Sequence, residues 1–312
     1  MPSEFDLIAR YFTRPPKKTL LGVGDDCALL RPDAGLELAV TTDMLVEGRH
    51  FLPGTAARSL GHKALAVNLS DLAAMGAAPR WATLSLALPS ADEAWLAAFS
   101  DGFFALAERH GVDLIGGDTT RGPVLTISVT AIGEVPSGVA MYRAAARPDD
   151  DVWISGDLGG AALALVHPEI ASVAAKLHEP EPRVELGERL RGLARAAIDV
   201  SDGLAGDLQH ILERSHVGAL IQYAEIPRHE AFSQRKDPKL EQDCVLSGGD
   251  DYELLFTVSR DRRREVEALA RELAVPLTRI GAIQSGQPRL VIVDPQGRPM
   301  TFRGGFDHFA QR

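Results

Sequence analysis

The sequence predicts a protein of mixed α/β class that is built from two domains. A chain of 312 residues is long enough for two domains of ordinary size, each with its own buried core. Strand-like and helix-like segments are interspersed in both halves, which is typical of sheets covered by helices. The halves are separated by a polar, proline-containing segment, RAAARPDDD at residues 143–151. We therefore expect an N-terminal domain over residues 1–140 and a C-terminal α/β domain over residues 141–312, with the junction near residues 136–150.

The N-terminal half is predicted to open with a helix over residues 3–12, because apolar side chains recur there at helical spacing. Strand-like runs follow at residues 36–43, 81–88, 113–118 and 124–135. Between them, helices are expected at residues 58–77 and 91–111. The second of these has Asp92 and Glu93 at its start and Gly111 just past its end, which is the expected polarity of a helix.

The C-terminal half repeats the mixture of strands and helices. Strands are expected at residues 152–156, 196–202, 217–223, 252–258 and 288–293. Helices are expected at residues 160–167, 183–196, 203–215 and 260–274. Because the two kinds of element alternate, this half also predicts a sheet with helices packed on it.

Composition and charge exclude several classes of protein. The net charge of −10 argues against a nucleic-acid surface, which needs a clustered basic face. No apolar run approaches the roughly 18 residues that span a bilayer, and the N-terminus lacks the basic start and apolar centre of a signal peptide. The two cysteines, Cys27 and Cys244, cannot form a disulfide framework. We expect a cytoplasmic protein.

Acidic residues gather in six short clusters, each beside a glycine or the end of a predicted strand. A single aspartate in such a place is usually a helix cap or a turn residue. Four clusters directly follow predicted strands, where ligands collect in α/β folds. The clusters are GVGDDCA (Asp25, Asp26), TTDMLVEG (Asp43), NLSDLAAMG (Asp71), LIGGDTT (Asp118), DVSDGL (Asp199, Asp202) and SGGDDYEL (Asp250, Asp251).

Converging carboxylates repel one another, so they tolerate proximity only around cations. Oxygen-only ligand sets suit Mg²⁺ or Mn²⁺, which commonly bridge to phosphate oxygens. The histidines and cysteines show no spacing typical of a zinc site. The clusters therefore predict a site for magnesium and phosphate groups.

Familiar phosphate-binding motifs do not identify the class of enzyme. The sequence contains no G-x-x-x-x-G-K-[ST] motif and no protein-kinase signature. The glycine turn in SGDLGGAALAL, residues 155–165, follows a predicted strand and opens a predicted helix. Its backbone N–H groups could hold an anion, although a lone glycine turn is more often a tight connection.

Taken in order, the motifs GDDCA, TTDMLVEGRHF, KALAVNLSDLAAMGA, LIGGDTTRG, DVSDGL and SGGDDYELLF resemble those of the thiamine-monophosphate kinase family. That family belongs to the superfamily of aminoimidazole ribonucleotide synthetase-like ATP-using enzymes. The resemblance extends from about Glu4 to the terminal GGFDHF, which is almost the whole chain. It implies a two-domain α/β fold and a homodimer in which the N-terminal sheets of two chains pair into a shared barrel. It also implies ATP-dependent phosphorylation of thiamine monophosphate to thiamine diphosphate, assisted by several Mg²⁺ ions.

The resemblance also implies a role for individual residues. The family's metal positions correspond to Asp26, Thr41, Thr42, Asp43, Asp71, Asp118, Asp199 and Asp202. Its nucleotide contacts correspond to Gly117, Asp118, Arg143 and Ser201, and its contacts with thiamine phosphate to His50, Asp250 and Phe306. Among these we expect the catalytic residues to be Asp118, Arg143 and Asp202. Asp250 stands where relatives often have glutamate, and Phe306 where tyrosine is common, so the contact with the acceptor differs in detail.

The chemistry agrees with an enzyme that is rich in acids. A phosphate monoester has a second pKa of about 6, so the attacking group is largely dianionic at neutral pH and needs no general base. Asp71, isolated among small apolar residues, is expected to cap or flank a helix end that faces the metals. Cys27 has no nearby histidine or second cysteine, so we interpret it as a small packed residue. Two other functions stay open: a related ATP-dependent synthetase with a different acceptor, and a non-catalytic protein that binds divalent cations.

Overall fold

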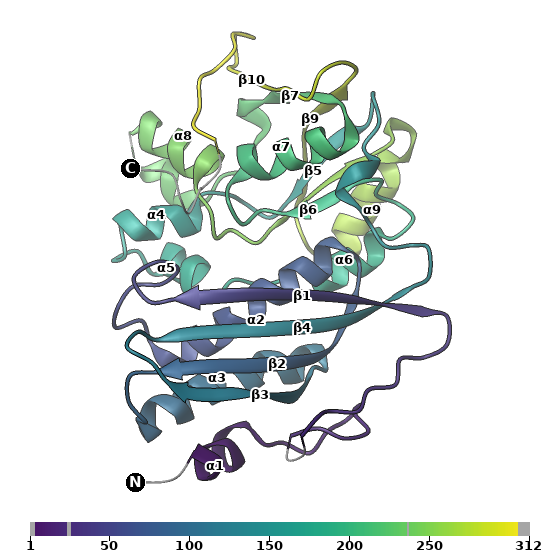
Figure 1. Ribbon diagram of the computed structural model, residues 1–312. Coiled ribbons are helices and arrows are strands. Elements are labelled where there is room, and N and C mark those ends of the chain that lie inside the picture. The colour runs from purple at the N-terminus through teal and green to yellow at the C-terminus, as the bar shows by residue number, and fades with distance from the viewer. Residues whose placement is uncertain (1–3, 24–25, 236, 305–312) are drawn as a thin grey trace. The chain divides into compact units, whose positions relative to one another are not determined.

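The computed structural model describes residues 4–23, 26–235 and 237–304 (Figure 1). The chain divides into two units. Unit 1 comprises Met1–Leu72 and Ala77–Gly138, and unit 2 comprises Ala73–Gly76 and Val139–Arg312.

Within the described part of unit 1, long strands form a four-stranded sheet in the order β1-β4-β2-β3. These strands are β1 (Leu36–Val46), β2 (Ala78–Leu88), β3 (Asp113–Arg121) and β4 (Thr126–Pro136). β4 pairs antiparallel with β1 and with β2, whereas β2 and β3 are parallel. A parallel pair needs a crossover, which α3 (Glu93–His110) provides.

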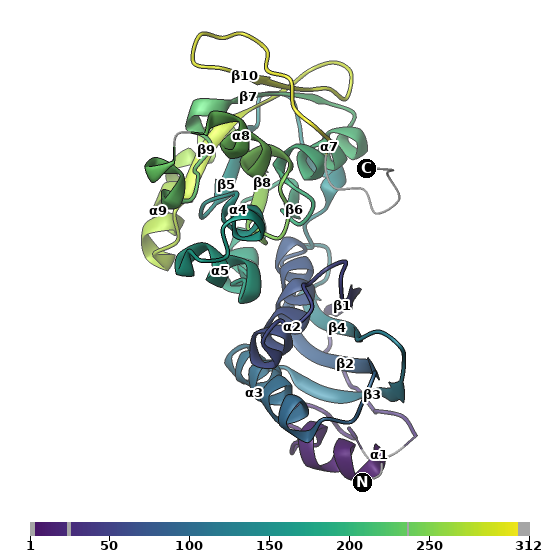
Figure 2. The same cartoon turned by 90° about the vertical axis from the view of Figure 1, so that its left-hand side faces the viewer.

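One face of this sheet is covered by α2 (Ala57–Ala74) and α3 (Figure 2). Glycines bring the two helices into backbone contact. A Cβ atom on Gly61 would lie 2.0 Å from the carbonyl oxygen of Phe99, and one on Gly102 would lie 1.8 Å from that of Arg58. Beneath the helices, large side chains such as Trp81 and Phe103 are almost fully buried.

The ends of α3 are fixed by the residues that the sequence indicated. The Asp92 side chain accepts hydrogen bonds from the backbone N–H of Ala94 at 2.9 Å and of Trp95 at 3.2 Å, so it caps the helix. Gly111 closes the other end in a left-handed conformation with φ of 66°. The first helix differs from the prediction: α1 (Glu4–Leu7) passes directly into the π-helical turn η1 (Ile8–Phe12).

Unit 2 contains, within its described residues, a six-stranded sheet in the order β10-β7-β9-β5-β8-β6. Its strands are β5 (Asp151–Ser155), β6 (Ala197–Asp199), β7 (Gly218–Gln222), β8 (Leu254–Val258), β9 (Leu277–Gln284) and β10 (Leu290–Val293). The helices are α4 (Gly160–Val166), α5 (Ala171–His178), α6 (Val184–Leu190), α7 (Leu204–Ser215), α8 (Pro238–Ser247) and α9 (Arg263–Leu273). Two units of mixed strands and helices confirm the predicted fold class.

Some elements were not predicted, and two strands run further than expected. The strand β9 and the helices α5 and α8 were not predicted from the sequence. β9 lies between β7 and β5, and a Cβ atom on its Gly281 would come within 2.2 Å of the carbonyl oxygen of Leu220. Because β1 and β3 continue past the predicted ends, Asp43 and Asp118 lie inside strands and not at their ends.

No single described helix is long and apolar enough to cross a membrane. The pair α4 and α5, bent by 113°, meets the criteria of length and composition only when the two helices are taken together.

Candidate functional site

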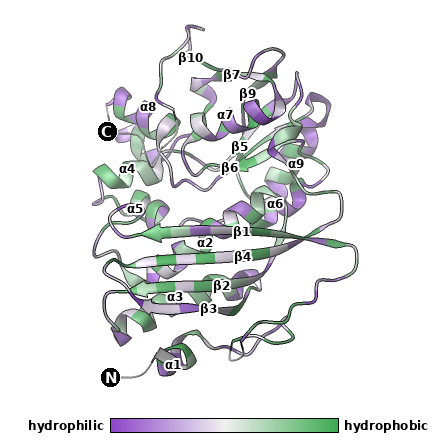
Figure 3. Cartoon of the chain, in the orientation of Figure 1, coloured by the Kyte–Doolittle hydropathy of each residue, from purple (hydrophilic) through white to green (hydrophobic). Residues whose placement is uncertain are grey.

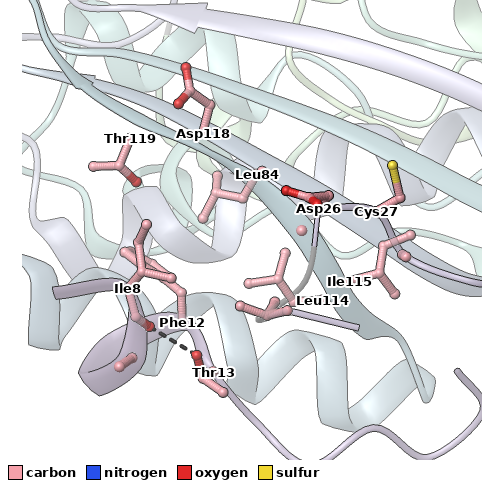
Figure 4. Close-up of a pocket in the computed structure, with 15 residues that line it drawn as sticks. Ile8, Phe12, Thr13, Asp26, Cys27, Leu84, Leu114, Ile115, Asp118 and Thr119 are labelled. Carbon is pink, nitrogen blue, oxygen red and sulfur yellow. Dashed lines mark hydrogen bonds between the residues drawn. The ribbon is translucent and has the colours of Figure 1, made fainter. Parts of the chain in front are cut away.

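One group of predicted site residues in unit 1 lines a cavity of about 670 Å³. Asp26 and Asp118 both face this cavity, although they are far apart in the sequence (Figure 4). Apolar side chains of η1, including Ile8 and Phe12, form another part of its wall. Cys27 also lines the cavity and is exposed, so the expectation that it is packed was wrong.

Glycine is required where β3 runs along the cavity. Gly117 pairs with Leu84 of β2 and has φ of 154°. A Cβ atom there would lie 1.8 Å from the Leu84 carbonyl oxygen, whereas one on Gly116 would meet nothing within 4 Å. The missing side chain lets the edge strand approach β2 closely, and it leaves the next residue, Asp118, exposed beside the cavity.

The N-terminal segment that forms part of the cavity wall is tied down by Asp113, which the sequence analysis did not single out. This buried carboxylate accepts hydrogen bonds from the backbone N–H of Lys17 at 2.9 Å and of Lys18 at 2.7 Å. It also accepts one from the Thr19 hydroxyl at 2.9 Å. Its position at the very start of a strand gave no sign of this role, because the partners are almost a hundred residues away.

A second group of predicted residues lies where β1 crosses α2. The Thr41 hydroxyl donates a hydrogen bond to Oδ2 of Asp71, and the backbone N–H of Asp43 donates to Oδ1 of Asn68 at 3.1 Å. Asp71 lies in the last turn of α2 and is half-buried. The structure therefore brings Thr41, Asp43 and Asp71 together.

Thr42 does not join this group, because successive side chains of a strand point to opposite faces. Its hydroxyl donates to the carbonyl of Val129 at 3.1 Å and accepts from the Thr130 hydroxyl at 3.0 Å. His50 lies in the turn after β1, where its Nδ1 accepts a hydrogen bond from the backbone N–H of Val46 at 3.0 Å. This bond leaves the proton of the neutral ring on Nε2.

In unit 2, predicted residues occupy the irregular segment between β6 and α7. Asp199 ends β6 and is 3% exposed. Ser201 and Asp202 follow, and their backbone N–H groups both donate to Oδ2 of Asp207, each at 3.0 Å. Burial raises the pKa of Asp207 to about 7, and the charge of Asp202 adds to the rise while that of Arg143 opposes it.

Arg143 is exposed in the short helix η2 (Arg143–Ala145), which packs on α7. Its carbonyl oxygen accepts a hydrogen bond from the Ser215 hydroxyl at 2.8 Å, and the same hydroxyl accepts from the backbone N–H of Ala146 at 3.1 Å. These bonds hold the backbone of Arg143 beside the helix that carries Asp207.

The segment with Asp250 runs directly against Ser201. The backbone N–H of Asp250 donates to the Ser201 carbonyl at 2.9 Å, and the Tyr252 hydroxyl donates to Oδ1 of Asp250 at 3.0 Å. Asp250 has φ of 68°, a left-handed conformation that a side chain adopts only at some cost. The structure thus brings Asp199, Ser201, Asp202 and Asp250 into one region, while Phe306 lies outside the described residues.

The glycine turn between β5 and α4 already holds an internal carboxyl group. Oδ2 of Asp251 accepts a hydrogen bond from the backbone N–H of Gly159 at 2.8 Å, and burial raises the pKa of this carboxyl well above its usual range. Nearby, Glu253 is 2% exposed and accepts two hydrogen bonds from Arg183, both at 2.6 Å. The turn therefore acts as a tight connection that anchors the Asp250 segment.

The donors fit magnesium by their chemistry, since they are carboxylate and hydroxyl oxygens. Across residues 4–23, 26–235 and 237–304, however, no group of three or more His, Cys, Asp or Glu side chains is arranged to hold a metal ion. Each group described above therefore supplies only part of a ligand set.

Comparison with known proteins shows the same two-part organisation. Residues 24–135 match the AIR synthase related protein, N-terminal domain, and residues 147–293 match the AIR synthase related protein, C-terminal domain. The thiamine-monophosphate kinase of Escherichia coli (strain K12) is 46% identical over 321 aligned residues, which span 98% of each chain.

Two solved structures extend this similarity to three dimensions. The crystal structure of thiamine-monophosphate kinase from Stenotrophomonas maltophilia K279a is 49% identical, with a TM-score of 0.84, and the match covers 92% of this chain and 94% of that one. The structure of AaThiL complexed with AMPPCP and TMP is 30% identical, with a TM-score of 0.77, and the match covers 92% of each chain.

Proposed function

The chain belongs to the AIR synthase related protein family and, within it, to the thiamine-monophosphate kinases, and on this premise we propose that it transfers the γ-phosphoryl group of ATP to thiamine monophosphate. The observation that carries the proposal is the match along almost the whole chain to enzymes named for this activity. A relative of the same fold has been solved with AMPPCP, an ATP analogue, and TMP. The geometry of both units agrees with this reaction.

The proposed nucleotide contacts are Gly117, Asp118, Arg143 and Ser201. In support, the cavity beside Gly117 combines apolar wall residues with carboxylates, as expected for a site that takes a base and its metal-bound phosphates. Arg143 can offer a guanidinium fork to phosphate oxygens.

Magnesium is proposed to be held by aspartate oxygens. Asp26, Asp118, Asp43 and Asp71 would contribute in unit 1, with the Thr41 hydroxyl beside Asp71. Asp199 and Asp202 would contribute in unit 2. When bound, Mg²⁺ neutralises charge on the β- and γ-phosphate oxygens, so that two anions can approach each other. Thr42 was also predicted to hold metal. Because its hydroxyl lies on the opposite face of β1 from Asp71, it would do so from that face or through its backbone carbonyl.

The acceptor is proposed to contact His50, Asp250 and Phe306. Its phosphate is already a nucleophile at neutral pH, so the protein has to orient it and need not remove a proton. The carboxylate of Asp250, held by Tyr252, can face the positive charge of a thiazolium ring. Asp118, Arg143 and Asp202 remain the proposed catalytic residues.

The test is a phosphoryl-transfer assay with ATP and Mg²⁺ that compares thiamine monophosphate, free thiamine and aminoimidazole precursors as acceptors. We expect thiamine diphosphate from thiamine monophosphate alone, no turnover after chelation with EDTA, and recovery when Mg²⁺ is restored. Asp118→Asn should lower kcat/KM by about 100-fold or more, because a site that stabilises developing charge loses a fixed partner.

Asp101→Asn is the matched control, since Asp101 is an exposed carboxylate on α3 of the same unit and should leave the rate unchanged. Transfer to a different acceptor would assign the chain to a related synthetase. Metal binding without transfer to any acceptor would favour a cation-binding protein.

We further propose that the enzyme is a homodimer whose N-terminal sheets pair through β1, which is one of the two edge strands of the described four-stranded sheet. On the face of β1 turned away from Asp71, large apolar side chains are exposed: Leu38 at 44%, Val40 at 63% and Met44 at 56%. Figure 3 shows green, hydrophobic segments along β1. An exposed apolar row on an edge strand is a common site for pairing with another chain. A cytoplasmic location is proposed because the reaction consumes ATP and both cysteines are free.

A further inference from the structure

Ser201 and Asp202 lie in a segment without regular secondary structure, yet their proposed roles require fixed positions. The segment is bounded by β6, which ends at Asp199, and by α7, which begins at Leu204. Gly203 in between has φ of 105°, and a Cβ atom there would lie 2.9 Å from the carbonyl oxygen of Gly248. The backbone is therefore tightly bent at Gly203, and this conformation needs stabilising contacts from neighbouring residues.

Asp207 supplies that restraint from the first turn of α7. Its Oδ2 accepts the backbone N–H groups of both Ser201 and Asp202 at 3.0 Å, and its own backbone N–H donates to the Gly203 carbonyl at 3.0 Å. One residue thus engages three successive residues of the bend. The side chain is 3% exposed, so these hydrogen bonds are shielded from water.

We propose that Asp207 is a positioning residue that sets the orientation of Ser201 and Asp202 toward the nucleotide and its metal. This inference rests on the proposed function for the identity of the reaction and for the roles of Ser201 and Asp202. Asp207 acts through the backbone of Ser201 and Asp202, because its Oδ2 atom accepts a hydrogen bond from the N–H group of each residue. Because successive amides point at one carboxylate oxygen, a shift of that oxygen would rotate both peptide planes and displace both side chains together.

The chemistry of the restraint suggests a graded series of variants. Asparagine keeps a carbonyl oxygen of the same reach, so it can still accept both backbone N–H groups, but it replaces the second carboxyl oxygen with an amide NH2 group. Alanine leaves two backbone N–H groups without their acceptor. The matched control is Glu213→Gln on the same helix, because Glu213 is exposed and accepts a hydrogen bond from the Gln209 side chain at 2.9 Å.

Steady-state kinetics give kcat, KM for ATP, KM for thiamine monophosphate and the Mg²⁺ concentration for half-maximal rate. Calorimetry measures the binding of Mg²⁺ and AMPPCP, and thermal unfolding gives the melting temperature of each variant. For Asp207→Ala we expect kcat/KM for ATP to fall, and the Mg²⁺ requirement to rise, by about 10- to 100-fold, the usual range for residues that orient a metal ligand. KM for thiamine monophosphate should change less than KM for ATP, because the proposed acceptor residue Asp250 is joined to Ser201 by one backbone hydrogen bond, at 2.9 Å, and its carboxylate is held separately by Tyr252. Asp207→Asn should recover part of the loss, and Glu213→Gln should match the wild type.

Two results would overturn the inference. One is unchanged kinetics and unchanged AMPPCP affinity in Asp207→Ala. The other is a loss of rate in both Asp207 variants that equals their loss of folded protein, with every KM and the Mg²⁺ requirement unaltered. If the wild type makes no thiamine diphosphate, the proposed function fails, but the binding of Mg²⁺ and AMPPCP to the variants still decides the role of Asp207.

Discussion

At Gly117, one missing methyl group decides whether β3 can lie against β2. The backbone there has φ of 154°, and the Leu84 carbonyl oxygen occupies the space where a Cβ atom would be. The neighbouring Gly116 has no such constraint, because nothing lies within 4 Å of its Cβ direction. Of the two adjacent glycines in LIGGDTT, Gly117 therefore leaves no room for a side chain, whereas the space at Gly116 would accept one.

Gly117→Ala should destabilise the protein by about 1–3 kcal/mol or more, since the new atom clashes with backbone that cannot move aside. The displacement should also shift Asp118 and weaken nucleotide binding. Gly116→Ala is the control and should preserve both properties. Urea unfolding and calorimetric binding of AMPPCP would measure the two effects, and equal losses in both variants would contradict the argument.

Asp207 shows how a residue can matter without belonging to a recognised motif. Asp207 makes three hydrogen bonds to the bent segment DVSDG. Its position in α7 does not by itself predict any of them. The same holds for Asp113, whose partners belong to the N-terminal segment. Both residues are carboxylates that hold backbone in place around predicted ligands.

Among the elements, α6, β5 and β8 of unit 2 are joined by a buried ion pair. Glu253 precedes β8 and receives two hydrogen bonds from Arg183, the residue before α6, and a third at 2.6 Å from the Ser155 hydroxyl of β5. Glu253 is 2% exposed. The same peptide segment carries Asp250 and Asp251, so the pair fixes the loop that faces the proposed acceptor.

Removing one member of this pair should be costly. Arg183→Ala should lower the free energy of unfolding by about 3 kcal/mol, because it leaves the buried Glu253 carboxylate with only the more distant Lys176 ammonium, at 3.6 Å, as a cationic partner among the described residues. Glu272→Ala breaks the exposed Arg189–Glu272 pair of the same unit, at 2.7 Å, and should have no measurable effect. Chemical denaturation of both variants measures the two free energies of unfolding. Similar losses of stability would show that burial does not determine how much an ion pair of this unit contributes.

The sequence predicted elements best where their signals are local. The ends of α3 follow from Asp92 and Gly111, which act within one helical turn. β9 went unpredicted because Arg279 and Gly281 interrupt its apolar pattern, and its strand conformation depends on pairing with both β7 and β5. β1 and β3 run past their predicted ends because pairing with β4 and β2 continues there.

For the whole molecule, the exposed apolar row on β1 predicts the state of assembly. Val40→Glu places a charge within the proposed pairing surface, where burial without a partner is unfavourable. We expect the variant to sediment as a monomer at concentrations where the wild type is a dimer. Leu165→Glu is the control, because Leu165 is similarly exposed, at 58%, but lies on α4 of unit 2. A wild type that is monomeric, or a Val40→Glu variant that remains dimeric, would contradict the proposal.

The sequence by itself determined the class of fold, the family, and the inventory of oxygen donors, because these depend on local periodicity and on the order of short motifs. Only the tertiary structure decided which donors meet. It paired Thr41 with Asp71 across β1 and α2, turned Thr42 to the opposite face, and placed Asp26 and Asp118 on one cavity. It also brought the Asp251 carboxyl group to the backbone N–H of Gly159 in the glycine turn, and the Asp207 carboxyl group to the backbone N–H groups of Ser201 and Asp202. Such contacts depend on strand register and on the approach of distant backbone, which no local pattern of residues encodes.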